Sequence, residues 1–199
     1  MSEVAVCNRA LQILGEAAII DLTEDNERAR SLTIAYPAVR DSELRKRKWK
    51  FSISRASIPA LADAPLFGFK NQFQLPVDYL RLLPGGDLVS GPDLSDIRWD
   101  SNALYAIEGK RILTSLSAPL RIRYIQRVTD TSLFDPAFAE YLSAKIAVAI
   151  CDRITQSDSK MQLSVAAAKL ALNEARNANA LESPSESISD DTWVAARAQ

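Results

Sequence analysis

The segment at 134–156, FDPAFAEYLSAKIAVAICDRITQ, constrains the fold more than any other part of the sequence. Asp135 is a suitable N-cap, and Pro136 is tolerated in a first turn because the backbone N–H there has no helical partner. Apolar residues then recur at helical spacing in two adjacent rows, Phe138, Leu142, Ile146 and Ala149, and Tyr141, Ala144, Val148 and Cys151. A helix with two apolar rows and few charges needs cover on most sides. The segment therefore predicts the central helix of a bundle.

The composition limits the class of protein. A chain of 199 residues with 47% apolar content can bury a real core, which fits one domain or one domain with an insertion. A net charge of −1 gives no global reason for binding nucleic acid or membranes. The chain has no histidine, the side chain most often used near neutral pH for proton transfer and metal ligation. We therefore expect a protein that is not an enzyme, with no catalytic residues, metal site or cofactor.

The cysteines and the apolar runs indicate a location. Cys7 and Cys151 both fall in apolar helical rows without metal-type spacing, which is typical of reduced core residues in a cytoplasm. The longest uncharged apolar run, 146–151, is far shorter than the roughly 20 residues of a membrane helix. The N-terminus also lacks a basic segment followed by an apolar run. We expect a soluble protein without a secretory signal.

Two further helices are predicted before the central one. The first covers 2–14 and has Ser2 as its N-cap, Gly15 as its stop and a buried face of Val4, Cys7, Leu11 and Leu14. The second follows the capping candidates Thr23, Glu24 and Asp25. Its expected buried stripe is Ala29, Leu32, Tyr36 and Val39, and its expected outer face is Arg28, Arg30, Asp41 and Glu43. Pro37 lies inside this pattern and is expected to kink the helix.

A basic segment with interleaved aromatic residues follows. Residues 40–55 contain seven basic and two acidic side chains, with Trp49 and Phe51 among them. One interpretation is a helix C-terminus, where cations favour the helix dipole, followed by a strand that buries Phe51 and Ile53. The other is a surface for a partner protein or for DNA phosphates.

The middle of the chain, 57–129, has short apolar runs separated by prolines and glycines. Strands are expected at 71–75, 79–83, 103–107, 111–114 and 120–128, with a hairpin turn at Glu108 and Gly109. Leu120, Ile122 and Tyr124 alternate with arginines, which predicts a sheet with one wet face. The prediction is an α+β fold in which a helical bundle, formed by 1–56 and 130–182, carries an inserted antiparallel β-sheet or barrel at 57–129.

The last helix is predicted to start at Ser157 and Asp158. Its expected inward residues are Leu163, Ala167, Leu170 and Ala171. The many alanines fit either close helix contact or a well-formed outer helix. From residue 182 the chain is rich in serine and has four acids against a single arginine, so 183–199 is expected to be a flexible tail.

Several segments resemble one family when they are taken together. They are VCNRALQILGEAAIIDL at 6–22, VRDSELRKRKWKFSISRASI at 39–58, FQLPVDYLRLL at 73–83, YAIEGKRILT at 105–114, IRYIQRVTDTSLFDPAFAEYLSAKIAVAI at 122–150, ITQSDSK at 154–160 and W-x-x-A-R at 193–197. In this order and spacing the chain resembles the tail tubular protein A family, the head-to-tail adaptors or gatekeepers of short-tailed bacteriophages. The resemblance covers nearly the whole chain.

That resemblance implies a structural virion protein with a helical domain and a β domain. Its copies would form a ring, expected to be a dodecamer, beneath the portal protein, with a tail nozzle or tail tube protein below. The viral DNA would pass through the lumen, and the ring would be assembled in the host cytoplasm without a membrane. Tryptophan and arginine commonly anchor protein interfaces. We therefore assign the subunit or portal interface to Arg45, Lys46, Arg47, Lys48, Trp49, Trp193 and Arg197.

Two alternatives remain from the residues alone. A nucleic-acid-binding module would use the basic stretch at 40–55 and would bind duplex DNA with a steep salt dependence. A glycan hydrolase would need two carboxylates across a cleft, for which the candidates are Asp78, Asp87, Asp93, Asp96 and Asp100. Acidic loops are far more often solvated turns. PGG at 84–86 lacks the lysine and the following helix of a phosphate-binding loop.

Overall fold

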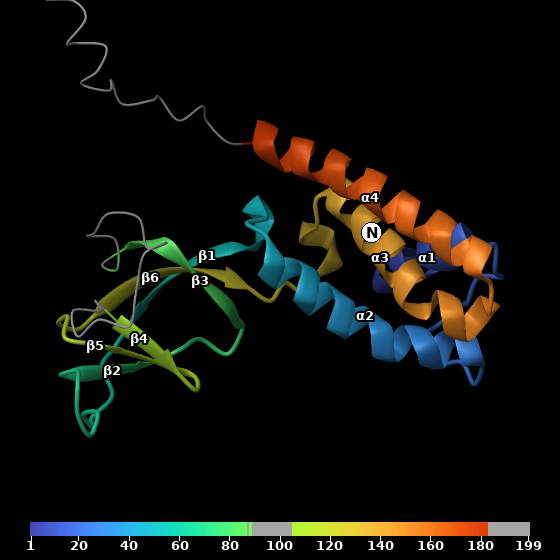
Figure 1. Cartoon of the computed structure of the whole chain (residues 1–199). Helices are drawn as coiled ribbons and strands as arrows, with labels where there is room; N and C mark the ends of the chain where they lie inside the picture. Colours follow the sequence, from blue (N-terminus) through green and yellow to red (C-terminus); the bar gives the residue numbers. More distant parts are fainter. Residues whose placement is uncertain (87, 89–104, 183–199) are drawn as a thin grey trace, which may run out of the picture.

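One helix surrounded by three others organises the two ends of the chain (Figure 1). The computed structural model describes residues 1–86, 88 and 105–182. Its helices are α1 (Glu3–Leu14), α2 (Glu27–Lys46), α3 (Pro136–Thr155) and α4 (Asp158–Leu181). We call these four helices the helical domain. Helix α3 packs against all three of the others, as predicted for the central helix of a bundle.

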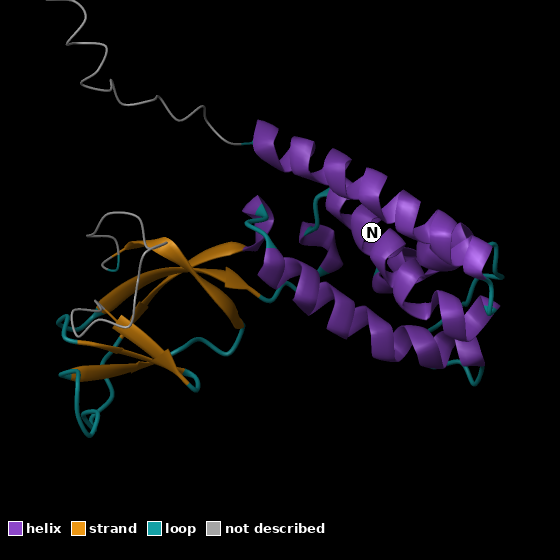
Figure 2. Ribbon diagram, in the orientation of Figure 1, coloured by secondary structure: helices purple, strands orange, loops and turns teal. Residues whose placement is uncertain are grey.

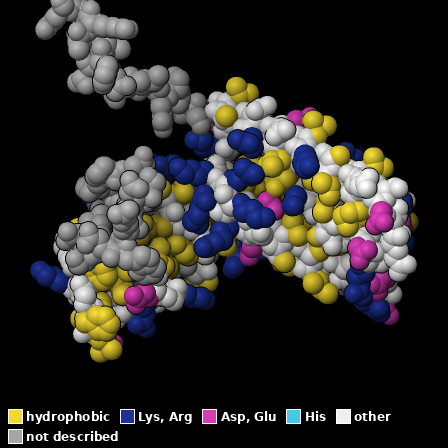
Figure 3. Space-filling view, viewed as in Figure 1, with side chains coloured by type: hydrophobic (Ala, Val, Ile, Leu, Met, Phe, Trp, Pro, Cys, Tyr) yellow, Lys and Arg dark blue, Asp and Glu magenta, His cyan; other side chains and the backbone are white. Residues whose placement is uncertain are grey.

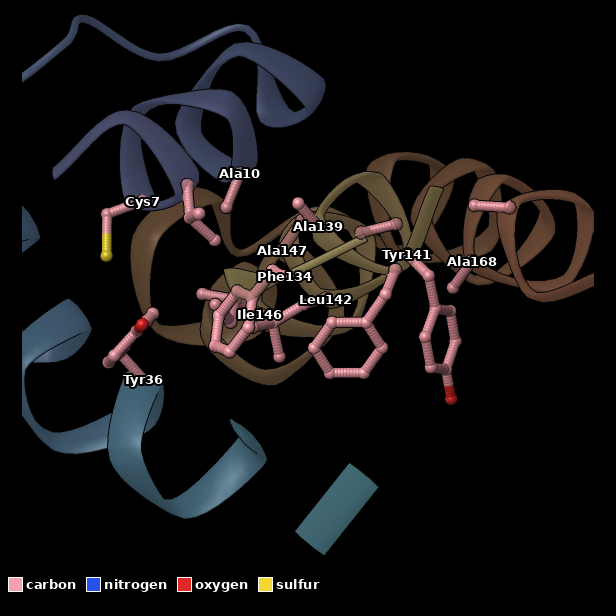
Figure 4. Packing of buried hydrophobic residues seen from close by; sticks show 14 of the residues in the cluster. Cys7, Ala10, Tyr36, Phe134, Ala139, Tyr141, Leu142, Ile146, Ala147 and Ala168 are labelled. Atoms are coloured by element: carbon pink, nitrogen blue, oxygen red, sulfur yellow. The ribbon is translucent and has the colours of Figure 1, made fainter. Parts of the chain in front are cut away.

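The start of α3 and its buried rows follow the sequence pattern closely. Asp135 caps the helix by accepting hydrogen bonds from the backbone N–H groups of Ala137 and Phe138 at 2.8 and 3.1 Å. Half of the helix is buried, and Figure 4 shows side chains of α3 facing α1 and α2. The prediction is wrong for Ala149, which is exposed while Ile150 is buried. Phe138, Leu142 and Ile146 are spaced four residues apart, and the same step leads to Ile150 and not to Ala149.

The other helices begin at residues that satisfy free backbone N–H groups. Ser2 Oγ accepts from the Ala5 N–H at 3.2 Å at the start of α1, and Gly15, with φ of 70°, ends this helix as predicted. The N-cap of α2 is Asn26, which lies after the three predicted capping residues and accepts from Ala29 N–H at 2.8 Å. Glu24 does not cap the helix because its carboxylate accepts hydrogen bonds from backbone N–H groups of the preceding loop.

Helix α4 buries Ala171 as predicted, but the rest of its inward face differs from the prediction. Leu163 and Leu170 were expected inside but are 71% and 62% exposed. The buried residues of α4 are small, and they are Ser164, Ala168, Ala171 and Ala175. Their small side chains let α4 lie close along α3, and this close approach leaves the larger leucines outside. Of the two interpretations of the alanine-rich run, the structure therefore favours close helix contact.

The middle of the chain forms two three-stranded antiparallel sheets (Figure 2). The strands are β1 (Ile53–Ile58), β2 (Asn71–Gln74), β3 (Tyr79–Gly86), β4 (Tyr105–Glu108), β5 (Arg111–Thr114) and β6 (Leu120–Gln126). The sheet orders are β1-β6-β3 and β2-β5-β4, and we call them together the β domain. The β4–β5 hairpin turns after Glu108, at Gly109 with φ of 59°, one position later than predicted. The predicted α+β fold class is confirmed.

Two hydrophobic clusters fill the molecule. The first lies among the four helices and includes Leu83 and Ile125 from the β1-β6-β3 sheet. The second lies within the β domain and contains Phe73, Ile112 and Ile122. The β1-β6-β3 sheet thus contributes to both clusters and joins the two domains. Among the described residues, no helix is long and apolar enough to cross a bilayer.

Candidate functional site

Trp49 was assigned to an interface, but the structure places it in the core. It follows the end of α2, and only 2% of its surface is exposed. Its ring lies 4.9 Å from that of Phe138 and 6.1 Å from that of Tyr141, measured between centroids. Its Nε1–H donates to the Glu43 carbonyl at 3.1 Å. The assignment of Trp49 to an interface surface is therefore wrong, because an aromatic ring after an amphipathic helix can equally close the core beneath that helix.

Glu43 was expected on the outer face of α2 and is also buried, with 2% exposed. Its carboxylate accepts hydrogen bonds from the Tyr141 hydroxyl at 2.6 Å and from Lys46 Nζ at 2.7 Å. These two bonds compensate for the loss of water around the charge. Burial and the neighbouring Glu43 carboxylate raise the pKa of Tyr141 well above its usual range. The phenol therefore stays protonated and acts as a hydrogen-bond donor.

The remaining basic residues of the predicted interface have different surroundings. Arg45 is exposed, but one end of its guanidinium donates to the Leu80 carbonyl and ties α2 to β3. Lys46 and Lys48 are exposed, and Arg47 is half-buried. Figure 3 shows lysine and arginine side chains gathered where the helical domain meets the β domain. The basic segment is therefore part of the junction between the two domains.

A pocket of about 430 Å³ opens at this junction. Its lining residues are Lys46, Arg47, Lys48, Trp49, Arg81, Arg176, Asn179 and Ala180, and we call it the junction pocket. Three elements contribute to it, namely the end of α2 with the turn after it, β3 and the C-terminal part of α4. The sequence pattern indicated the residues at the end of α2 and in the turn after it, but it did not indicate Arg81, Arg176 and Asn179. No local signal connects these residues, because they come together only through tertiary folding.

A second candidate surface lies on α4. Leu163, Leu170 and Leu181 are separated by nearly whole numbers of helical turns, so they share one face. They are 71%, 62% and 87% exposed. We call them the α4 leucine row. In a monomer this row has no partner among the described residues.

A third candidate surface is the loop between β1 and β2. Leu66 is 99% exposed and Phe67 is 87% exposed. Beside them is an open hollow of about 640 Å³, lined by the loop and by the β4–β5 hairpin. Leu66 and Phe67 are adjacent and both exposed, and a contiguous apolar patch is the kind of surface that contacts another molecule.

The carboxylates of the hydrolase alternative receive little support from the described residues. Asp78 Oδ1 accepts a hydrogen bond from the Tyr124 hydroxyl at 3.1 Å, which is a structural contact within the β domain. Asp87, Asp93, Asp96 and Asp100 lie outside the described residues, as do Trp193 and Arg197 of the predicted interface. Within the described ranges there is no group of three or more potential metal ligands, and both cysteines are buried and unpaired.

No protein-family model matches the sequence, and no curated protein matches it.

Proposed function

We propose that the protein is a structural virion subunit, a head-to-tail connector adaptor that forms a ring beneath the portal and links it to the tail. The viral genome would pass through the lumen of this ring. The observation that carries the proposal is the pair of unpartnered apolar surfaces, the α4 leucine row on the helical domain and the Leu66–Phe67 loop on the β domain. Soluble monomers rarely expose large contiguous apolar patches, and such patches mark sites of contact with other molecules.

The position of the two surfaces favours repeated contacts between different faces. The leucine row is on the helical domain and the loop is at the far side of the β domain (Figure 1). Two different surfaces on one subunit allow a heterologous contact, which generates a ring when the rotation closes. Burying one leucine side chain contributes about 1.5–3 kcal/mol. Such contacts are weak singly and strong when repeated around a ring.

The proposal assigns the partners as further copies of the chain, the portal protein and a tail nozzle or tail tube protein. The protein would act in the virion, without catalysis and without a cofactor. The candidates for a contact surface remain Arg45, Lys46, Arg47 and Lys48. Trp49 is buried and supports this segment from the core. Trp193 and Arg197 remain predictions for the portal contact.

Replacement of the leucine row tests the proposal. The double substitution Leu163→Ser and Leu170→Ser should prevent or weaken ring formation on a portal ring, because it removes apolar area that a neighbour would cover. The free energy of unfolding of the isolated chain should change by no more than about 0.5 kcal/mol per site, as is usual for exposed positions. Assembly is measured by co-sedimentation with the portal ring.

A matched control uses Ile34→Ser, which removes an aliphatic side chain that is 75% exposed on α2. This variant should assemble normally. Unimpaired assembly of the leucine double variant would contradict the assignment of the α4 leucine row to a subunit contact.

A further inference from the structure

The junction pocket is built from three separate parts of the chain that are tied together by hydrogen bonds. The Asn179 side chain holds the turn after α2 by accepting from the Lys50 N–H at 2.8 Å and donating to the Lys48 carbonyl at 3.0 Å. Buried Trp49 lies beneath this turn. Arg81 Nη1 donates to the Lys46 carbonyl at 3.3 Å and connects β3 to the end of α2. The basic side chains of the pocket therefore project from a fixed backbone.

The charge in the pocket is unbalanced. Five of its lining residues are basic, and none is acidic. Lys46 pairs with the buried Glu43, but Arg47, Lys48, Arg81 and Arg176 form no ion pair with any described residue. The Nε atoms of Arg47 and Arg81 are shielded from solvent and have no hydrogen-bond partner within the described ranges. Like charges that line one pocket repel one another, and a bound anion would relieve that repulsion.

We propose that the junction pocket is a binding site for a phosphate group. Arginine offers a planar fork of donors and lysine a point charge, and donors that approach from α2, β3 and α4 suit a tetrahedral anion better than a planar carboxylate. The pocket offers no stacking platform for a base, because its aromatic residue, Trp49, is almost wholly buried. Recognition is therefore of the phosphate alone, and the two sources of this chemistry are the phosphodiester of a nucleic acid backbone and free inorganic phosphate.

The proposal goes beyond the connector function and does not depend on ring formation, because one subunit supplies every residue of the pocket. A single site of this kind neutralises few phosphates, so its contact with a nucleic acid has a shallow salt dependence. That behaviour differs from the steep dependence expected of a dedicated nucleic-acid-binding module.

The test uses the full-length chain and three probes, namely a fluorescently labelled short DNA duplex, inorganic phosphate and acetate. The pocket variant carries Arg81→Gln and Arg176→Gln, which remove two charges and keep similar side-chain lengths. The control variant carries Lys70→Gln and Lys169→Gln, which remove the same charge at two exposed positions outside the pocket. Circular dichroism checks folding, and Lys48→Gln serves as a second pocket variant because Lys48 is exposed.

Anisotropy reports duplex binding, and calorimetry reports binding of the two small anions. We expect the pocket variant to bind duplex or inorganic phosphate about tenfold more weakly or worse, with the control variant unchanged. Loss of duplex binding, with displacement of the duplex by phosphate, assigns the site to nucleic acid; loss of inorganic phosphate binding alone assigns it to the free anion. Equal losses in the pocket and control variants, equal binding of acetate and phosphate, or no binding of either phosphate probe would overturn the proposal.

Discussion

Replacing Trp49 by alanine distinguishes a core residue from an interface residue. The ring is 2% exposed and contacts Phe138 and Tyr141, and its N–H donates to the Glu43 carbonyl at 3.1 Å. Loss of a buried tryptophan costs about 3–5 kcal/mol, from lost burial and from the cavity that remains. For a chain of this size each kcal/mol lowers Tm by about 2–4 °C, so a fall of about 6–20 °C is expected.

The assays are thermal unfolding, which gives Tm, and urea unfolding, which gives the free energy of unfolding; both follow the isolated chain by circular dichroism at a helical wavelength. Trp49→Phe keeps an aromatic ring and loses the N–H donor, so it should cost less, about 1–2 kcal/mol. Lys48→Ala, at the exposed neighbouring position, should stay within about 0.5 kcal/mol of the wild type. If Trp49→Ala kept the wild-type unfolding midpoint but failed to assemble on a portal ring, the core placement of Trp49 would be refuted.

Two further predictions concern buried polar groups. Glu43→Ala should lower the free energy of unfolding by about 1–3 kcal/mol because it leaves the Tyr141 hydroxyl buried without its acceptor. Lys46→Ala removes the more exposed partner of Glu43 and should lower it by less than about 1 kcal/mol. Equal losses of the two variants in urea unfolding would contradict this prediction. Burial raises the pKa of Cys7 from 9.0 to about 12 and that of Tyr36 from 10.0 to about 12. As the pH rises, the unfolded chain loses these protons at a lower pH than the folded chain does. The free energy of unfolding should therefore fall between pH 9 and 12, and the contribution of the two groups is complete only below pH 9. A free energy of unfolding that rises over this interval would contradict the prediction.

Local signals in the sequence predicted the elements that depend on local chemistry. Asp135 followed by Pro136 marks the start of α3, and Gly15 marks the end of α1, because these residues satisfy backbone needs within one turn. Alternation of Leu120, Ile122 and Tyr124 likewise predicted the buried face of β6. In each case the residues that carry the signal are the ones that determine the local structure.

The errors at Glu43 and on α4 have one common cause, which is the influence of elements that are distant in sequence. The sequence pattern predicts Glu43 on the outer face of α2. Tyr141, far along the chain, supplies a hydrogen-bond donor that makes its burial possible. On α4 the predicted inward face combines Leu163 and Leu170 with Ala167 and Ala171, whereas the folded helix buries Ser164, Ala168, Ala171 and Ala175. The small residues are the buried ones because α3 presents a surface against which α4 can lie closely.

The candidate surfaces were predictable only in part. The basic character of residues 45–48 is visible in the sequence, but the pocket also needs Arg81 and Arg176. These residues are brought to the end of α2 by the pairing of β3 with β6 and by the length of α4. A site whose parts come from three elements has no short motif.

The central claim is that the chain is a building block whose exposed apolar surfaces are covered by copies of itself and by neighbouring virion proteins. Light scattering with and without a portal ring measures this directly. The account predicts that the mass of the portal ring rises by many copies of the chain. A chain that keeps the mass of a single copy and leaves the portal ring unbound would contradict it.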